Sequence, residues 1–161
     1  MKLILIFIII VLVGCTTTTQ IPHQNPTIIT KTHTTIKWLP FNDDLIKKSI
    51  ILNKLIFVYL NDESCDICKR MEKSTFGDKF IIKLINNKFI STSIDVEQNP
   101  IAAAIFYNND ITVPKIVFIK PTDDRWIVSE ITGYMNVFRM VEAINAAEIF
   151  VKDNINENQS N

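Results

Sequence analysis

Hydrophobic and polar positions along the chain follow two periodicities, and this pattern predicts a protein built from both helices and strands. A short continuous apolar run from Leu55 to Leu60 is rich in β-branched and aromatic residues, which is typical of a buried strand. Further strands are predicted at 89–95, 115–119 and 126–132, the last two joined by a hairpin loop from Pro121 to Asp124.

Apolar residues at helical spacing separate these strands. The predicted helices span 45–52, 65–73, 78–87, 100–106 and 136–152. Asp43 or Asp44 is the expected cap of the first helix, and Asn99 followed by Pro100 is the expected start of the fourth. The order is helix, strand, helix, strand, helix, hairpin and helix once the second and third helices are taken together. This order predicts an α/β sandwich with a mixed central sheet.

Two of these helices have apolar residues that are expected to face the core. In the first helix they are Leu45, Ile46, Ile50 and Leu52, and in the second they are Ile67 and Met71. The third helix carries Phe80, Ile81, Leu84 and Ile85. Gly133 is expected to allow a turn or bulge before the last helix.

The first residues of the chain are typical of an export signal. Lys2 precedes an unbroken apolar stretch from Leu3 to Val13, which is too short for a membrane-spanning helix of about 20 apolar residues. Leu12 to Cys15 resembles the lipobox of bacterial lipoproteins, in which the cysteine is lipidated and the preceding peptide, here residues 1–14, is removed. An ordinary signal peptide with an incidental Cys15 is the alternative.

Residues 15–36 are predicted to be the lipidated cysteine and a flexible tether, because they are rich in threonine and show no periodicity. His23 and His33 lie in this segment and are expected to be solvated rather than metal ligands. Residues 37–152 are expected to form one folded domain, and residues 153–161 a disordered polar tail.

The candidate chemistry is a pair of thiols, Cys65 and Cys68, placed where the strand at 55–60 leads into a helix. Unpaired N–H groups and the helix dipole at that helix start favour negative charge and lower the pKa of the first thiol. With a second thiol within reach, the pair is suited to dithiol–disulfide exchange.

The charge balance and the number of candidate ligands argue against several kinds of binding function. The 17 basic and 17 acidic residues balance, so nothing favours nucleic acid as a partner. Two thiolates without a further cysteine or histidine in the domain fall short of a closed zinc site, although Cu(I) could accept two sulfurs. Lys69 rather than histidine follows Cys68, which disfavours haem attachment. No cofactor or metal is expected.

The apolar strand, the Cys65–Cys68 spacing, Val113-Pro114 before a strand, the hairpin and Gly133 together resemble the thioredoxin fold. More closely, residues 65–72 resemble the thioredoxin-like group with a C-x-x-C-K-x-M-E helix start, and Phe76, 87–90 and Asp95 match its later landmarks. The resemblance covers about residues 37–150 and implies a thioredoxin-like three-layer sandwich with a central mixed β-sheet flanked by helices.

This resemblance also implies site residues. Pro114 takes the place of the family's cis-proline beside the dithiol, and the backbone of Val113 is expected to bind an extended substrate chain. Two departures stand out. Asp66 places a carboxylate between the cysteines, opposing the favourable charge of Lys69. Tyr59 stands near the position of the buried acid that helps deprotonate the second thiol, and Glu63 or Asp62 is the candidate replacement.

The sequence therefore predicts a monomeric thiol:disulfide oxidoreductase, lipid-anchored to the bacterial cell envelope with its domain facing the periplasm or the outside. Cys65 is the expected nucleophile and Cys68 the resolving thiol. The expected partners are thiol- or disulfide-containing envelope proteins, including a membrane thiol-reductant transporter, and reductase is the favoured direction. The alternative is a non-catalytic binding or assembly lipoprotein of the same fold, with a static disulfide.

Overall fold

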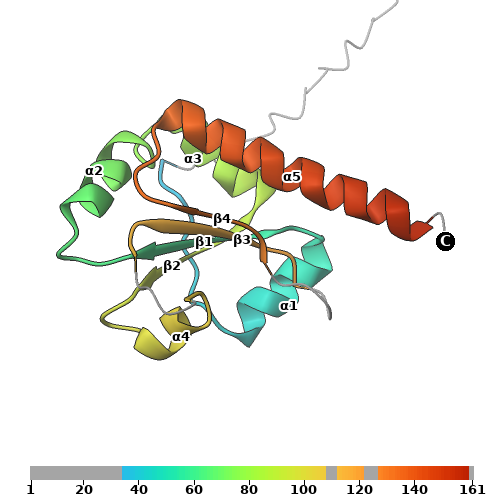
Figure 1. The fold of residues 1–161 in the computed structure, drawn as a ribbon, viewed down its shortest axis with the longest axis horizontal. Helices are drawn as coiled ribbons and strands as arrows, with labels where there is room; N and C mark the ends of the chain where they lie inside the picture. The colour runs from blue at the N-terminus through green and yellow to red at the C-terminus, as the bar shows by residue number, and fades with distance from the viewer. Residues whose placement is uncertain (1–33, 108–111, 122–126, 160–161) are drawn as a thin grey trace, which may run out of the picture. The chain divides into compact units, whose positions relative to one another are not determined.

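A computed structural model describes residues 34–107, 112–121 and 127–159, all of which belong to one compact unit (Figure 1). In chain order the elements are α1 (Asp43–Leu52), β1 (Ile56–Asn61), α2 (Asp66–Ser74), α3 (Lys79–Lys88), β2 (Ile90–Asp95), α4 (Pro100–Ala104), β3 (Lys115–Ile119), β4 (Ile127–Thr132) and α5 (Val137–Gln159). The strands agree closely with those predicted from the sequence.

The four described strands form one mixed sheet in the order β2-β1-β3-β4. β1 runs parallel to β2, and β3 is antiparallel to both β1 and β4. An isolated parallel bridge between Trp38 and Ser91 adds the segment before α1 to the free side of β2. The predicted α/β sandwich with a mixed central sheet is therefore confirmed.

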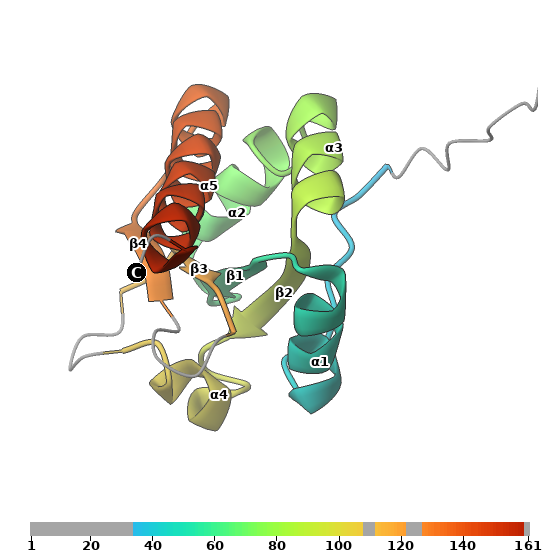
Figure 2. The same ribbon diagram turned by 90° about the vertical axis from the view of Figure 1, so that its right-hand side faces the viewer.

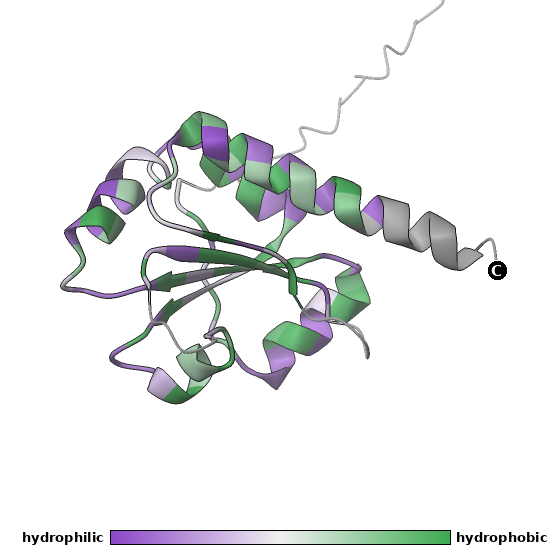
Figure 3. Ribbon diagram, in the orientation of Figure 1, coloured by the Kyte–Doolittle hydropathy of each residue, from purple (hydrophilic) through white to green (hydrophobic). Residues whose placement is uncertain are grey.

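Helices cover both faces of the sheet. Figures 1 and 2 show α2, α3 and α5 on one face and α1 with α4 on the other. β1 is buried on both faces: Phe57 and Tyr59 pack under α2, α3 and α5, whereas Ile56, Val58 and Leu60 pack against α1 and α4. This explains its continuous apolar run, and Figure 3 shows β1 and β3 as hydrophobic along most of their length.

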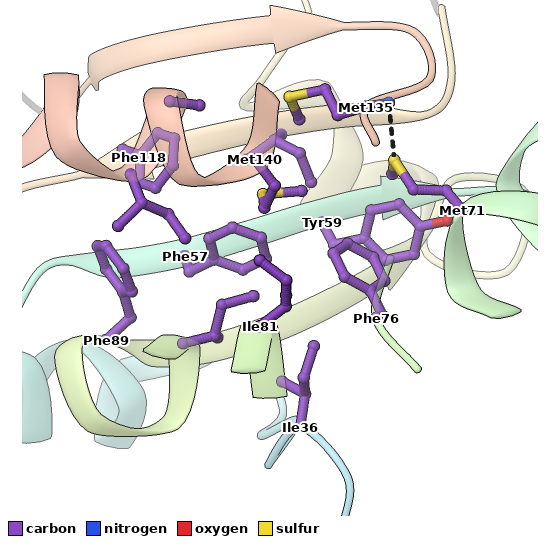
Figure 4. Close-up of a cluster of buried hydrophobic side chains, with 14 of the residues drawn as sticks. Ile36, Phe57, Tyr59, Met71, Phe76, Ile81, Phe89, Phe118, Met135 and Met140 are labelled. Carbon is purple, nitrogen blue, oxygen red and sulfur yellow. Dashed lines mark hydrogen bonds between the residues drawn. The ribbon is translucent and has the colours of Figure 1, made fainter. Parts of the chain in front are cut away.

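An aromatic cluster fills the space between the sheet and the three covering helices (Figure 4). Phe57 lies at its centre, with ring centroids 5.5 Å from Phe118, 5.9 Å from Phe89 and 6.1 Å from Phe76. These separations lie in the range in which tilted and edge-to-face rings attract one another. The cluster therefore ties β1 and β3 to α3 and to the turn that precedes it.

In several helices, the side chains that face the core are not the ones expected from the sequence. In α1, Ser49 is buried while Ile50 and Leu52 are about half exposed, and in α2, Ile67 is exposed while Cys68 is buried. One residue along a helix rotates the side chain by about 100°, and the sheet beneath α2 takes Cys68 in place of Ile67. The predicted burial of Met71 is confirmed. Phe80 on α3 is likewise exposed.

The helix ends also differ in places. Asn42, not Asp43 or Asp44, caps α1, since its side chain accepts a hydrogen bond from the N–H of Leu45 at 3.0 Å. α4 ends at Ala104, and α5 extends to Gln159, so the helix includes most of the predicted polar tail. The predicted hairpin loop falls largely at 122–126, outside the described residues. In the described ranges, no helix is both long and apolar enough to cross a membrane.

The cap assignment predicts a difference between two neighbouring substitutions. Asn42→Ala should lower the free energy of unfolding by about 1 kcal/mol, because it leaves an N–H at the start of α1 without its partner. Asp44→Ala should change it by only a few tenths of a kcal/mol, because its pair with Lys47 is exposed. Denaturant unfolding of both variants measures this, and a larger loss for Asp44→Ala would contradict the assignment.

Candidate active site

The thiol pair follows directly from the end of the buried strand β1. After Asn61 the chain turns, and the Asp62 side chain accepts a hydrogen bond from the N–H of Ser64 at 2.6 Å. The carbonyl of Asp62 accepts the N–H of Cys65 at 3.0 Å. Such a turn places Cys65 at the N-cap of α2, so the strand-to-helix position predicted from the sequence is confirmed.

Cys65 and Cys68 are joined by a disulfide, with their Cα atoms 5.2 Å apart. Cys68 is fully buried, whereas Cys65 is only partly buried. The N–H of Cys68 points at the sulfur of Cys65 at 3.1 Å. After reduction, this N–H and the start of α2 would stabilise a thiolate on Cys65. The less buried cysteine is therefore also the one that the helix start favours as a thiolate.

The charged side chains around the pair act only weakly on it. The carboxylate of Asp66 lies 4.0 Å from the ammonium of Lys69, and both side chains are largely exposed. The guanidinium of Arg70 lies over the ring of Tyr134, 4.5 Å from its centroid. Because both groups are exposed, water and salt screen their opposing effects on Cys65. The helix start is then the main local influence on Cys65.

The two acids suggested as proton carriers are held by other partners. The hydrogen bonds from the backbone and side chain of Ser64 lower the pKa of Asp62. Glu63 accepts a hydrogen bond from the Gln98 side chain at 2.7 Å, and its own N–H donates to Asp95 at 3.1 Å. Neither acid is therefore directed toward Cys68 by its hydrogen bonds.

Tyr59 is buried in β1, near the position where the family resemblance implies a buried acid in related proteins. Its hydroxyl donates to the Glu72 carboxylate at 3.1 Å, a contact that the sequence analysis did not anticipate. Burial and the negative charge of Glu72 raise the pKa of Tyr59 far above its ordinary value. Tyr59 therefore remains protonated and acts as a hydrogen-bond donor rather than as a base.

Val113 and Pro114 lie at the same end of the sheet as the dithiol turn. Their peptide bond is cis, as the family resemblance predicted. Pro114 is buried and is followed by β3, whose first residue Lys115 pairs with Leu60 near the end of β1. The role of Val113 and Pro114 in binding a substrate chain stays a prediction.

Lys115 is a buried cation that the sequence analysis missed. Its ammonium group donates to the Phe106 carbonyl at 3.3 Å and lies 3.8 Å from the Glu130 carboxylate. It also lies 5.0 Å from the centroid of the Tyr107 ring. These contacts connect the start of β3, just after Pro114, with the chain following α4. Lysine in an otherwise apolar strand is the sequence signal that marks this position.

The opposite end of α2 is fastened to the turn between β4 and α5. The Thr75 hydroxyl donates to the Met135 carbonyl at 2.6 Å, and the N–H of Met135 points at the sulfur of Met71 at 3.4 Å (Figure 4). The hydroxyls of Ser74 and Tyr134 lie 3.0 Å apart. Residues about 60 positions apart thus hold α2, which explains why sequence patterns did not reveal the contacts.

The predicted lipidation site and the two histidines of the predicted tether are not in the described part of the chain. Cys15, His23 and His33 lie outside the described residues. Across residues 34–107, 112–121 and 127–159, no three or more histidine, cysteine or acidic side chains are grouped so that they could hold a metal ion. The described site is therefore a dithiol with its surrounding polar contacts.

Gly133 has a backbone that few other residues adopt, and it contacts Pro114. Its φ is +93°, and its N–H donates to the Pro114 carbonyl at 2.8 Å. Gly133→Ala should therefore lower the free energy of unfolding by about 1–2 kcal/mol through backbone strain, although open space surrounds the added methyl group.

Gly133→Asn is the matched control, since asparagine tolerates positive φ better than alanine does, and it should lose less. Thermal or denaturant unfolding compares the two variants. Equal losses would show that φ is not the source of the effect.

Similar solved structures show the fold. A solution structure of a thioredoxin from Thermus thermophilus is 19% identical, with a TM-score of 0.57, covering 69% of this chain and 85% of that chain. A structure of a DsbH oxidoreductase is 12% identical, with a TM-score of 0.60, covering 74% of this chain and 89% of that chain. The chain therefore has the thioredoxin-like fold, and at a general level the fold and its thiol pair support thiol–disulfide oxidoreductase chemistry.

Curated relatives match part of the chain. Rat (Rattus norvegicus) spermatogenesis-associated protein 20 is 29% identical over 80 residues, which make up 50% of this chain and 10% of that protein. Uncharacterized protein B0495.5 of Caenorhabditis elegans is 27% identical over 78 residues, or 48% of this chain and 11% of that protein. The match thus spans about a tenth of the length of these relatives. Residues 19–127 match Thioredox_DsbH, described as "Protein of unknown function, DUF255", and the chain belongs to this family.

Proposed function

We propose that this protein is a lipid-anchored thiol:disulfide oxidoreductase of the bacterial cell envelope that reduces disulfides in protein partners. The observation that carries the proposal is the asymmetry of the Cys65–Cys68 pair at the start of α2. Cys65 is only partly buried and its sulfur faces an N–H donor, whereas Cys68 is fully buried. A dithiol of this kind can attack a partner with one thiol and complete the exchange with the other.

The reaction begins with the reduced pair. The Cys65 thiolate attacks one sulfur of a partner disulfide, so that a mixed disulfide forms and the other partner sulfur leaves as a thiolate. Cys68 then loses its proton and attacks the sulfur of Cys65. This releases the second partner thiolate and forms the Cys65–Cys68 disulfide. The partner gains two electrons, and a dithiol donor, which we propose to be a membrane thiol-reductant transporter, restores the reduced pair.

The substrate chain is proposed to lie in an extended conformation beside Val113 and Pro114. These residues precede β3 at the end of the sheet from which the dithiol turn emerges. The backbone N–H and carbonyl of Val113 would pair with the partner chain, as strand addition does elsewhere. Such main-chain recognition suits an enzyme that acts on disulfides in different sequences.

Anchoring is proposed from the sequence of the first 36 residues. The apolar stretch before Cys15 and the resemblance of 12–15 to a lipobox support lipidation of Cys15 after removal of residues 1–14. Residues 16–36 would then form a tether between the membrane and the domain. This arrangement would keep the dithiol in the periplasm or outside the cell, near other envelope proteins.

The exchange mechanism predicts that two cysteine variants behave differently. In a chain beginning at Thr16, Cys68→Ser should accumulate mixed disulfides with envelope proteins through Cys65, because no thiol remains to resolve them. Cys65→Ser should trap far less, since Cys68 is buried. Non-reducing gel electrophoresis followed by mass spectrometry measures both.

Two results would count against this function. Equal trapping by both variants would remove the asymmetry of the pair, and a disulfide that resists a strong dithiol reductant would favour a binding lipoprotein with a static disulfide. The equilibrium reduction potential of the Cys65–Cys68 pair, measured in glutathione buffers, gives the direction of electron transfer. A value near the roughly −270 mV of thioredoxin supports the reductase, and one near −120 mV would indicate an oxidant.

Lipidation predicts incorporation of labelled palmitate into the full chain when it is expressed in bacteria. Cys15→Ala should abolish the label, because the acylated residue is gone, whereas Cys65→Ser should keep it. Fluorography of the purified proteins measures the label, and equal labelling of wild type and Cys15→Ala would rule out Cys15 as the acylated residue.

A further inference from the structure

A second candidate site lies on the β2 side of the sheet, away from the thiols. An open cavity of about 340 Å³ lies among the segment before α1, the strands β1 and β2, and the helices α2 and α3 with the turn between them. Neither cysteine of the dithiol lines it, nor do Val113 and Pro114. Its walls include Ile36, Trp38, Tyr59, Glu72, Phe76 and Ile82. The volume is at the lower end of the range of small-molecule sites.

Three aromatic rings form the aromatic part of the cavity wall. Ring centroids are 5.9 Å apart for Trp38 and Tyr59, 5.6 Å for Trp38 and Phe76, and 4.9 Å for Tyr59 and Phe76. Tyr59 and Phe76 are buried, as Figure 4 shows for this corner of the core, whereas Trp38 is 37% exposed. Trp38 therefore supplies most of the open ring surface, and indole is the aromatic ring that attracts cations most strongly.

The same wall carries one carboxylate. Glu72 Oε1 accepts the hydroxyl of Tyr59 at 3.1 Å, and this bond holds the carboxylate beside the rings. Four ion pairs are found in the described part of the chain, and none of them includes Glu72. Because the Tyr59 hydroxyl stays protonated, it remains a donor to Glu72. Glu72 is exposed to solvent, so its negative charge lies at an open part of the cavity wall, and none of these ion pairs neutralises it.

This combination selects one class of ligand. An anion would be repelled by Glu72, and a neutral molecule would gain no attraction from its charge. A single carboxylate among rings is a poor site for Ca²⁺ or Mg²⁺, which take several oxygen ligands. An ammonium ion with alkyl substituents meets both features, since it can lie against Trp38 and pair with Glu72. We propose that this cavity binds a small organic ammonium ion between the Trp38 ring and the Glu72 carboxylate.

Choline and its neutral isostere 3,3-dimethyl-1-butanol test this proposal on the full chain. The protein is purified in a maltoside detergent, which carries no ammonium group. The indole N–H resonance of Trp38 is observed by NMR and assigned through Trp126→Phe, because the sequence has two tryptophans. Choline should shift this resonance saturably in the millimolar range, roughly up to 50 mM. The isostere should shift it at least about tenfold less at equal concentration.

Matched variants separate the charge of Glu72 from the general charge of the protein. Glu72→Gln keeps the shape of the side chain and should weaken choline binding by roughly two- to fivefold, because the lost pair is exposed to solvent. Glu142→Gln removes an exposed carboxylate from α5 and should leave binding unchanged. The proposal is overturned by no saturable shift with choline, by an equal shift with the isostere, or by equal loss in both variants. Thiol exchange does not enter this test, so either proposal can fail while the other holds.

Discussion

Burial of β1 on both faces is the constraint on which the rest of the structure depends. Its side chains alternate between two apolar layers, and its backbone pairs with β2 on one side and β3 on the other. A strand held in this way has little freedom at its end. The side-chain amide of Asn61, the last residue of β1, donates a hydrogen bond to the Ser93 hydroxyl at 2.8 Å and ties this end to β2. The turn that leads to Cys65 therefore starts from a fixed point.

α2 connects this fixed point to both candidate sites. Its first residues follow the Cys65 cap, and Glu72, four residues after Cys68, lines the aromatic cavity. At its far end, Thr75 holds the turn before α5. A helix fastened at both ends keeps Cys68 buried while leaving Cys65 partly accessible. The difference between the two thiols thus results from how α2 is packed, and not from the spacing of the cysteines alone.

The order of elements and the place of the dithiol were predictable because their signals are local. The apolar run of β1, the turn at 61–64 and the thiols of α2 are adjacent in the chain. The inward faces of the helices were predicted less well. Ile67 and Ile50 are apolar at plausible helical spacing, yet the rotation of each helix on the sheet turned them outward. That rotation depends on how each helix packs, and it buries Cys68 and Ser49, whose burial the sequence pattern did not indicate.

The sequence by itself determined the strands, the thiol pair at a helix start, and the proline before β3, because hydrogen bonding and side-chain periodicity act over a few residues. The tertiary structure alone decided the partner of Tyr59 and the union of Trp38 with Glu72 and Phe76 in one cavity. These residues come from the segment before α1, from β1, from α2 and from the turn between α2 and α3. They meet only because the two-sided burial of β1 fixes the layers on either side of it, and no local pattern carries that information.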